Sequence, residues 1–114
     1  MINSKPITTS QHLDGLQGSI AIVTGGGTGI GRSIALALAS YGAIVMIVGR
    51  RLKMLQEVES IADGMLGKVI AHQADISDSS QVNDLVTTTV QQFSQIDVLF
   101  NNAGLIGEVH GIPL

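Results

Sequence analysis

A glycine-rich loop is the first feature of the sequence that could do chemistry. It reads Thr24-Gly25-Gly26-Gly27-Thr28-Gly29-Ile30-Gly31 and joins an apolar segment to an amphipathic one. Where a strand leads into a helix, the first backbone amides of the helix have no partner within it and lie at the positive end of the helix dipole. Glycines leave these amides open to a phosphate group that side chains would hold away. The loop therefore predicts an anion site.

Two classes of nucleotide site compete for this loop. The usual dinucleotide fingerprint places glycines at n, n+2 and n+5, whereas Gly25, Gly29 and Gly31 stand at n, n+4 and n+6. The loop is also a near match to the mononucleotide P-loop, but Arg32 stands where that motif has lysine. A planar guanidinium does not simply replace an ammonium, and the nearest candidate magnesium ligand, Asp75, follows a weak apolar segment. A P-loop NTPase is the less favoured alternative.

The elements that must position the loop alternate along the chain. Apolar runs rich in β-formers predict strands at 19–24, 44–48, 68–73 and 96–100. Helical spacing of apolar residues follows the first three runs, from Ile30 to a terminating Gly42, from Leu52 to about Gly64, and from Ser77 or Asp78 to Phe93. This order predicts an α/β fold, a Rossmann-like doubly wound parallel sheet of about four strands and three helices, with its ligand at the carboxyl ends of the strands.

The third predicted helix has two further features. Gln81 stands three residues after Asp78, the spacing of a capping box. One stripe of the helix contains Val82, Leu85, Val86, Thr89, Val90 and Phe93. A helix with such a stripe is expected to cover one face of the sheet.

Length, composition and charge limit the number of domains and the classes of function that the chain can have. A chain of 114 residues with 45% hydrophobic content corresponds to one domain; we expect an N-terminal extension over 1–17 and a partial nucleotide-binding domain over 18–114. The net charge of -3 argues against nucleic-acid binding, and the lack of cysteine excludes disulfides and thiolate metal sites. No apolar run is long enough to cross a bilayer and no signal peptide is evident, so a cytoplasmic location is expected.

Three motifs in order resemble the short-chain dehydrogenase/reductase family. They are Thr24-Gly25 with Gly29-Ile30-Gly31, Ala74-Asp75-Ile76, and Asp97 leading to Asn101-Asn102-Ala103-Gly104, and together they span about residues 16–104. The resemblance implies that the glycine loop holds the pyrophosphate of a nicotinamide dinucleotide. It also implies that Asp75 bonds the adenine amino group, that Ile76 covers the adenine ring, and that residues 102–104 lie near the ribose. Asp75 has a local alternative as a helix cap, and Asn101 is expected mainly to tie strand ends together.

The end of the second predicted strand bears on the choice of cofactor. An NAD enzyme places a carboxylate there for the ribose hydroxyls, whereas this chain has Gly49 followed by Arg50 and Arg51. A guanidinium suits a phosphate, so the sequence predicts NADP, with Arg50 as the main contact and NAD still possible. NADP-dependent members of the family often carry a second basic residue at the position of Thr28, and this chain has none there. The predicted cofactor-binding residues are Gly25, Gly27, Thr28, Gly29, Ile30, Gly31, Arg50, Asp75, Ile76, Asn102, Ala103 and Gly104, and no catalytic or metal-binding residue is predicted.

The acid/base residues of the family have no counterpart in the sequence. The family reaction transfers hydride between nicotinamide and a carbonyl or alcohol carbon, using a serine, a tyrosine and a lysine four residues after that tyrosine. The single tyrosine is Tyr41, and Val45 stands four residues later. We expect the cofactor-binding half of an NAD(P)-dependent oxidoreductase, inactive alone, with an oligomer or a complementing chain as possible partners. A non-catalytic dinucleotide-binding module remains the alternative.

Overall fold

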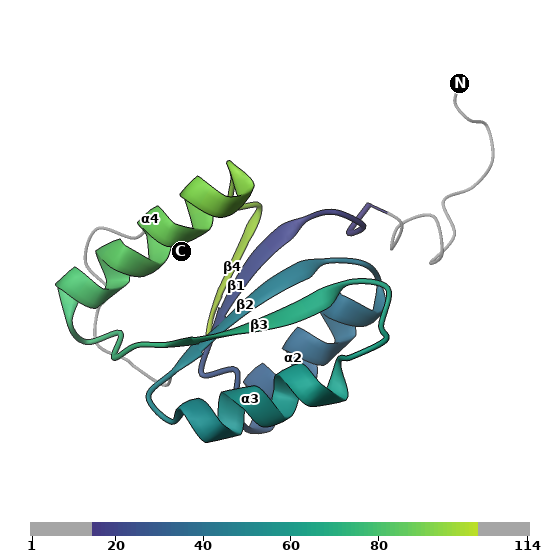
Figure 1. Cartoon of the computed structure of the whole chain (residues 1–114), viewed down its shortest axis with the longest axis horizontal. Helices are drawn as coiled ribbons and strands as arrows, with labels where there is room; N and C mark the ends of the chain where they lie inside the picture. The colour runs from purple at the N-terminus through teal and green to yellow at the C-terminus, as the bar shows by residue number, and fades with distance from the viewer. Residues whose placement is uncertain (1–14, 103–114) are drawn as a thin grey trace.

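The computed structural model describes residues 15–102, and in this range four strands alternate with three helices (Figure 1). The elements are β1 (Ile20–Thr24), α2 (Gly29–Ser40), β2 (Ile44–Gly49), α3 (Leu52–Ile61), β3 (Lys68–Gln73), α4 (Ser79–Phe93) and β4 (Val98–Asn101). No helix in this range is long and apolar enough to cross a membrane.

The four strands form one parallel sheet in the order β3-β2-β1-β4. The chain winds outward from β1 to β3 and then crosses back over the sheet to place β4 on the other side of β1. The winding direction therefore reverses next to β1, where a ligand crevice forms at the carboxyl ends of the strands. The prediction of a Rossmann-like doubly wound sheet is confirmed.

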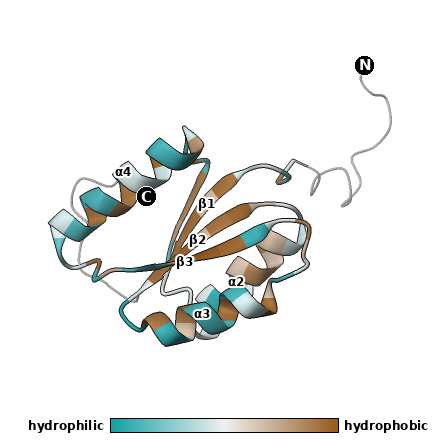
Figure 2. Cartoon of the chain, in the orientation of Figure 1, coloured by the Kyte–Doolittle hydropathy of each residue, from teal (hydrophilic) through white to brown (hydrophobic). Residues whose placement is uncertain are grey.

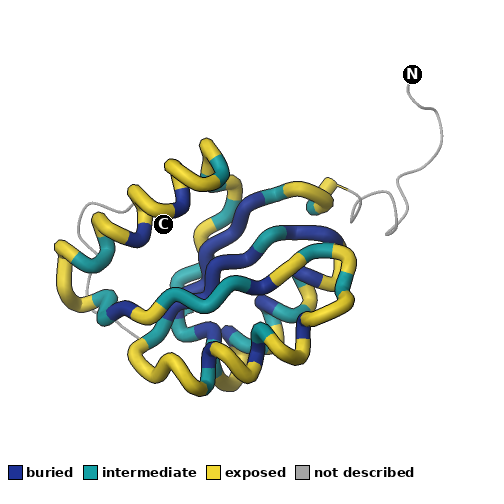
Figure 3. Tube along the Cα trace, in the orientation of Figure 1, coloured by how far each residue is buried: buried dark blue, intermediate teal, exposed yellow. Residues whose placement is uncertain are grey.

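Helices cover both faces of the sheet, and each face has its own core (Figures 1 and 2). The α2 and α3 side buries Ala21, Val23, Ala35, Ala39, Ala43, Val45, Ile47, Leu55, Val58, Ala62 and Val69. The α4 side buries Ile22, Met46, Val48, Ala74 and Leu85. All of β1 is buried, as its almost unbroken apolar sequence predicts for a strand covered on both faces (Figure 3).

The end of α2 follows from the glycine predicted to terminate it. Gly42 has φ +102°, in the left-handed region. Its N–H donates to Ala39 C=O, and Ala43 N–H donates to Leu38 C=O. These two bonds are the Schellman pattern that satisfies the last carbonyls of a helix, so α2 stops in time for the chain to enter β2.

The stripe on α4 is only half buried. Leu85 and Thr89 are buried, and the Thr89 hydroxyl donates to Leu85 C=O at 2.8 Å. Val86 and Val90, in contrast, are 41% and 42% exposed. The part of the chain that the structure describes has no element packed over these two valines. The sequence pattern gave the apolar stripe of α4 correctly but not how much of it the sheet covers.

Two local predictions needed correction. Asp78 is the N-cap of α4 and accepts from Ser80 N–H at 2.9 Å, but Gln81 does not close a capping box, because its Oε1 accepts from Asp75 N–H at 2.7 Å. The last strand begins at Val98 and not at residue 96. Ile96 instead packs against the core on the α4 side before the strand starts.

Ser94 ends α4 in a conformation that favours glycine, and this generates a test. Its φ is +71°, and its N–H donates to Val90 C=O at 2.7 Å. Because a Cβ is strained in the left-handed region, we expect Ser94→Gly to raise the free energy of unfolding by about 0.5–1 kcal/mol in urea denaturation. The control Gln91→Gly, at an exposed position within α4, should lower it by about 0.5–1 kcal/mol. Equal effects of the two changes would contradict this explanation.

Candidate functional site

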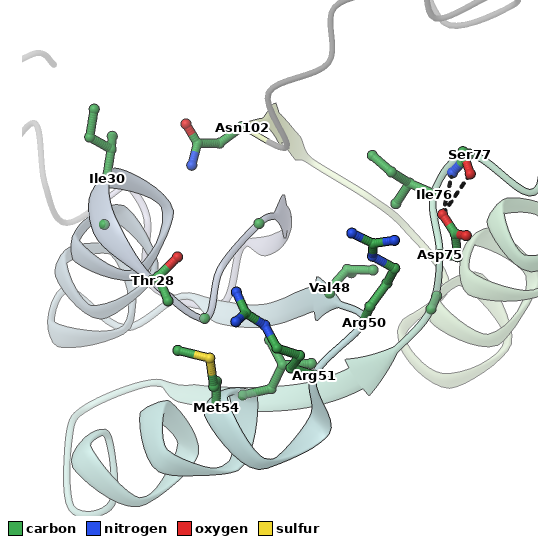
Figure 4. A pocket seen from close by; sticks show the side chains of 16 residues that line it. Thr28, Ile30, Val48, Arg50, Arg51, Met54, Asp75, Ile76, Ser77 and Asn102 are labelled. Carbon is green, nitrogen blue, oxygen red and sulfur yellow. Dashed lines mark hydrogen bonds between the residues drawn. The ribbon is translucent and has the colours of Figure 1, made fainter.

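A cavity of about 1050 Å³ opens at the carboxyl edge of the sheet (Figure 4). Its walls come from the loop before α2, from the end of β2 with the start of α3, and from the segment after β3. Its lining residues are Gly25, Gly27, Thr28, Gly29, Ile30, Val48, Gly49, Arg50, Arg51, Met54, Leu55, Ala74, Asp75, Ile76, Ser77 and Asn102. The volume lies just above the roughly 300–1,000 Å³ typical of small-molecule sites.

The glycine loop presents free amides to this cavity. Gly25 and Gly29 have φ of +68° and +57°, a backbone that a residue with a Cβ rarely adopts. Gly25 N–H donates to Val48 C=O at 2.8 Å, which ties the loop to β2. The N-cap residue of α2, Thr28, makes no side-chain cap to the helix. The first amides of α2 therefore remain available to an anion, and the dipole of the helix favours one there.

Gly31 has a different reason to be glycine. It is buried and does not line the cavity. A Cβ at this position would collide with Gly25 C=O and would lie 2.7 Å from Asn102 Nδ2. The expectation that a side chain at residue 31 would hold a phosphate away is therefore replaced by a packing reason: Gly31 lets the first turn of α2 close against the loop and against the turn after β4.

Thr24 connects the ends of β1 and β4. Its side chain is buried, its hydroxyl donates to Asn101 Oδ1 at 2.8 Å, and the same hydroxyl accepts from Asn102 N–H at 2.9 Å. The predicted role of Asn101 in tying strand ends is consistent with the first bond. The second bond fixes the backbone of Asn102, whose side chain reaches the cavity (Figure 4). One hydroxyl thus holds the turn after β4 beside the glycine loop.

Two arginines bring positive charge to the cavity from the end of β2. In Figure 4, Arg50 extends toward the segment of Asp75 and Ile76, and Arg51 extends toward Thr28. Arg51 is also the N-cap of α3 and makes no side-chain cap, so the first two amides of α3, those of Leu52 and Lys53, have no cap partner, whereas Met54 N–H donates to Arg51 C=O. Sequence reasoning selected Arg50 but not Arg51 as a site residue.

Asp75 lies across the cavity from Arg50 and is held by a serine. Its Oδ1 accepts from Ser77 N–H at 3.0 Å and from Ser77 Oγ at 2.7 Å. These bonds, with a smaller contribution from the charge of Arg50, lower the pKa of Asp75 from its usual 3.8. Within residues 15–102 its second oxygen, Oδ2, makes no hydrogen bond. Asp75 therefore orders the segment before α4 and still offers an ionised oxygen to a donor group in the cavity.

Most of the predicted site residues lie together at the cavity. Gly25, Gly27, Thr28, Gly29, Ile30, Arg50, Asp75, Ile76 and Asn102 line it, Gly31 is buried behind it, and Ala103 and Gly104 lie outside the described residues. The lining residues that the sequence analysis missed are Val48, Gly49, Arg51, Met54, Leu55, Ala74 and Ser77. All of them follow or end β2 and β3, so the rule that ligands bind at strand carboxyl ends was the signal that could have found them. The described residues contain no group of three or more side chains that could hold a metal ion.

The contribution of the two Thr24 hydroxyl bonds to stability can be tested by substitution. Thr24→Val keeps the shape of the side chain but leaves Asn101 Oδ1 and Asn102 N–H without their partner. We expect the free energy of unfolding to fall by about 1–3 kcal/mol, the usual cost of an unsatisfied buried polar group. Thr24→Ser, which keeps the hydroxyl, should lose less. Urea denaturation of both variants measures the difference, and a Val variant as stable as the Ser variant would show that the hydroxyl does not hold the turn.

Comparison with known sequences places the chain among oxidoreductases. The family model described as short chain dehydrogenase matches residues 19–112. The chain is 41% identical over 93 residues to a 3-oxoacyl-[acyl-carrier-protein] reductase of Synechocystis, a match that covers 79% of this chain and 37% of that protein. It is 39% identical over 87 residues to the short-chain dehydrogenase/reductase homolog YusS of Bacillus subtilis, covering 75% of this chain and 80% of that protein. The chain thus spans little more than a third of the Synechocystis enzyme.

Solved structures agree with the sequence matches. A metagenomic short-chain oxidoreductase in complex with NADP superposes with a TM-score of 0.75 at 36% identity, over 78% of this chain and 40% of that one. An NAD+-bound xylitol dehydrogenase gives a TM-score of 0.74 at 30% identity, over 79% of this chain and 35% of that one. Because the family model covers most of the sequence and the fold agrees with both structures, this chain belongs to the short-chain dehydrogenase/reductase family of oxidoreductases.

Proposed function

We propose that the chain binds a nicotinamide dinucleotide in the cavity and prefers NADP(H) to NAD(H). Family membership leaves this choice open, because one similar structure is a complex with NADP and another is bound to NAD+. The observation that favours NADP is the pair of guanidiniums at the end of β2, where Arg50 and Arg51 both line the cavity. Within this proposal the amides of α2 hold the pyrophosphate, as the open N-terminus of that helix allows.

The surroundings of Arg50 and Arg51 fit an additional phosphate. The uncapped N-terminus of α3 adds the positive end of a second helix dipole at the same place. At Gly49, the position of the carboxylate in an NAD enzyme, a Cβ would lie 3.5 Å from Leu55, an ordinary contact. The Cβ of a side chain would fit there, so close packing does not require glycine at this position. A phosphate would meet two guanidiniums and no carboxylate from β2.

The adenine end of the proposed site lies at the segment after β3. The free Oδ2 of Asp75 is an acceptor for an exocyclic amino group, and the low pKa of Asp75 keeps it ionised at neutral pH. Ile76 and Val48 line the cavity nearby and supply apolar surface for a flat ring. The bond from Ser77 and the acceptor role are compatible, since they use different oxygens of one carboxylate.

We also propose that hydride transfer requires groups that this chain does not supply. Tyr41 is the single tyrosine of the sequence. It stands at the end of α2, is 44% exposed and does not line the cavity. The described cavity wall contains no lysine and no histidine. In these terms the chain is the cofactor-binding part of a dehydrogenase, and a general acid must come from elsewhere.

Two alternative functions can be distinguished from the proposed one. A non-catalytic dinucleotide-binding module would bind the same ligand but would not be part of any turnover. A P-loop NTPase would need a positive side chain from the loop at the phosphates, whereas Arg32 does not line the cavity. Titration with NADPH, NADH and ATP, with and without magnesium, tests this point, because only the NTPase requires magnesium-dependent binding of ATP.

The preference for NADP(H) predicts the effect of reversing one charge. Arg50→Asp removes a charge-assisted hydrogen bond worth about 1.5–3 kcal/mol and introduces a carboxylate that repels phosphate. We expect the ratio of the dissociation constants for NADH and NADPH to fall by about 10-fold or more. Lys53→Asp is the matched control, because Lys53 is exposed at the start of α3 but does not line the cavity. Fluorescence titration measures both ratios, and an equal shift in the two variants would remove Arg50 from the specificity site.

The absence of acid/base groups predicts binding without turnover. The purified chain mixed with NADPH and a panel of aldehydes and ketones should bind the nucleotide without oxidising it, as followed by the absorbance of the reduced nicotinamide. The Synechocystis reductase assayed in parallel on a 3-oxoacyl substrate is the positive control. Carbonyl reduction by this chain alone would refute the proposal that its acid/base machinery is missing.

A further inference from the structure

The segment that links β3 to α4 leaves the sheet at Asp75. Ala74 N–H still donates to Gly49 C=O at 2.9 Å and continues the pairing of β3 with β2 by one bond. Successive residues of a strand point their N–H and C=O groups to opposite sides, so Asp75 N–H turns away from β2. It donates to Gln81 Oε1 at 2.7 Å, and Asp75 C=O accepts from Asp78 N–H at 3.0 Å. The start of α4, and not the sheet, therefore holds both backbone groups of Asp75.

The side-chain amide of Gln81 is fixed in orientation by its second neighbour. Its Nε2 donates to Asp78 Oδ2 at 3.1 Å. Because an ionised carboxylate accepts hydrogen bonds and a backbone N–H donates them, only one orientation of the amide satisfies both neighbours. Asp78 is held in turn as the N-cap of α4, since its Oδ1 accepts from Ser80 N–H and Ser80 Oγ. The bonds from Ser80 and Gln81 lower the pKa of Asp78 from its usual 3.8, so this acceptor is ionised at neutral pH.

Two different residues hold the backbone and the carboxylate of Asp75. Gln81 bonds the backbone N–H, whereas Ser77 Oγ donates to Asp75 Oδ1 at 2.7 Å (Figure 4). The first bond fixes where the residue lies at the cavity wall, and the second fixes how its carboxylate is turned. A group that recognises a ligand must be held within about 0.5 Å of its productive position. Gln81 itself does not line the cavity, so it can reach a ligand there only through Asp75.

We propose that Gln81 is a positioning residue for base recognition, which holds Asp75 where its carboxylate selects a base with an amino group. The inference rests on the proposed function, in which Asp75 Oδ2 accepts from the exocyclic amino group of adenine. In hypoxanthine a carbonyl oxygen replaces this amino group, so the carboxylate meets a second acceptor. The neighbouring N–H of the hypoxanthine ring lies to one side. A carboxylate that is held in place cannot follow that N–H, whereas a loosened one can.

The preference for adenine over hypoxanthine tests this role in the full chain. The two ligands are NADPH and its deamino analogue, in which hypoxanthine replaces adenine. Both have the same charge and the same fluorescent reduced nicotinamide, so the ratio of their dissociation constants reports the base alone. We expect the parent chain to bind NADPH about tenfold or more tightly, the usual worth of a hydrogen bond to a charged group. Gln81→Met, which keeps the length of the side chain but has no amide, should lower this ratio by about fivefold or more.

A matched control separates positioning from a general change in α4. Gln92→Met makes the same exchange at an exposed position near the end of the helix, which does not line the cavity. It should leave the ratio unchanged. Circular dichroism confirms that each variant is folded. Gln81→Asn, whose amide is one methylene short of Asp75 N–H, provides a second reading if Gln81→Met does not fold, and the same loss of preference is expected.

A double-mutant cycle shows whether Gln81 acts through Asp75. Asp75→Ala removes the carboxylate but keeps the backbone N–H that bonds Gln81, and it should abolish the preference for NADPH over the deamino analogue. Gln81→Met added to Asp75→Ala should change the ratio no further. If Gln81→Met lowers the ratio equally in both backgrounds, Gln81 acts by another route and the proposal is overturned.

The outcomes separate this inference from the proposed function. A parent chain that binds neither nucleotide refutes the proposed function and the inference together. A parent chain that prefers NADPH, with the full preference retained in the Gln81 variants, overturns the positioning role while the dinucleotide site stands. Equal binding of both nucleotides by the parent chain shows that Asp75 does not select the base and also overturns the role of Gln81. A preference lost on changing Gln81, and only while Asp75 is present, supports it.

Discussion

The open amides at the N-terminus of α2 are the constraint on which the rest of the site depends. They exist because the chain turns from a buried strand into a helix through glycines whose backbone is left-handed at Gly25 and Gly29. No side chain caps them, so the helix dipole is directed into the cavity. Two further contacts at the carboxyl edge support this turn: Gly31 lets the loop close, and Thr24 holds Asn102 beside it.

Sequence reasoning recovered the fold because each element has its own local signal. The apolar run of β1 is buried along its whole length, and Gly42 ends α2 where a left-handed residue was expected. The sequence did not reveal side-chain contacts that depend on tertiary distance. Gln81 has the spacing of a capping box, yet it bonds Asp75 N–H because the segment after β3 comes close to it. Arg51 was missed because its place on the cavity wall depends on how α3 leaves β2.

The exposure of half of the apolar stripe on α4 also depends on tertiary contacts that the sequence does not reveal. Periodicity identifies which side of a helix is apolar, but the width of the buried stripe depends on what packs against it. Here the sheet covers Leu85 and Thr89 and leaves Val86 and Val90 exposed. Leu99 is partly exposed on the same face. The apolar surface without a neighbour therefore gathers on the β4 side of the fold, opposite the edge that Glu59 protects.

Cofactor binding and sheet completion are separate problems in this chain. The cavity walls come from the ends of β1, β2 and β3 with one residue after β4, and these parts are fixed by the central strands of the described sheet. The backbone groups of Val98 and Phe100 that face away from β1 have no partner within residues 15–102, and neither residue lines the cavity. The cavity at the strand ends therefore does not depend on what lies beside the outer edge of β4. Within the proposed function, dinucleotide binding rests on backbone amides and charge at the strand ends, and it does not call on the groups needed for hydride transfer.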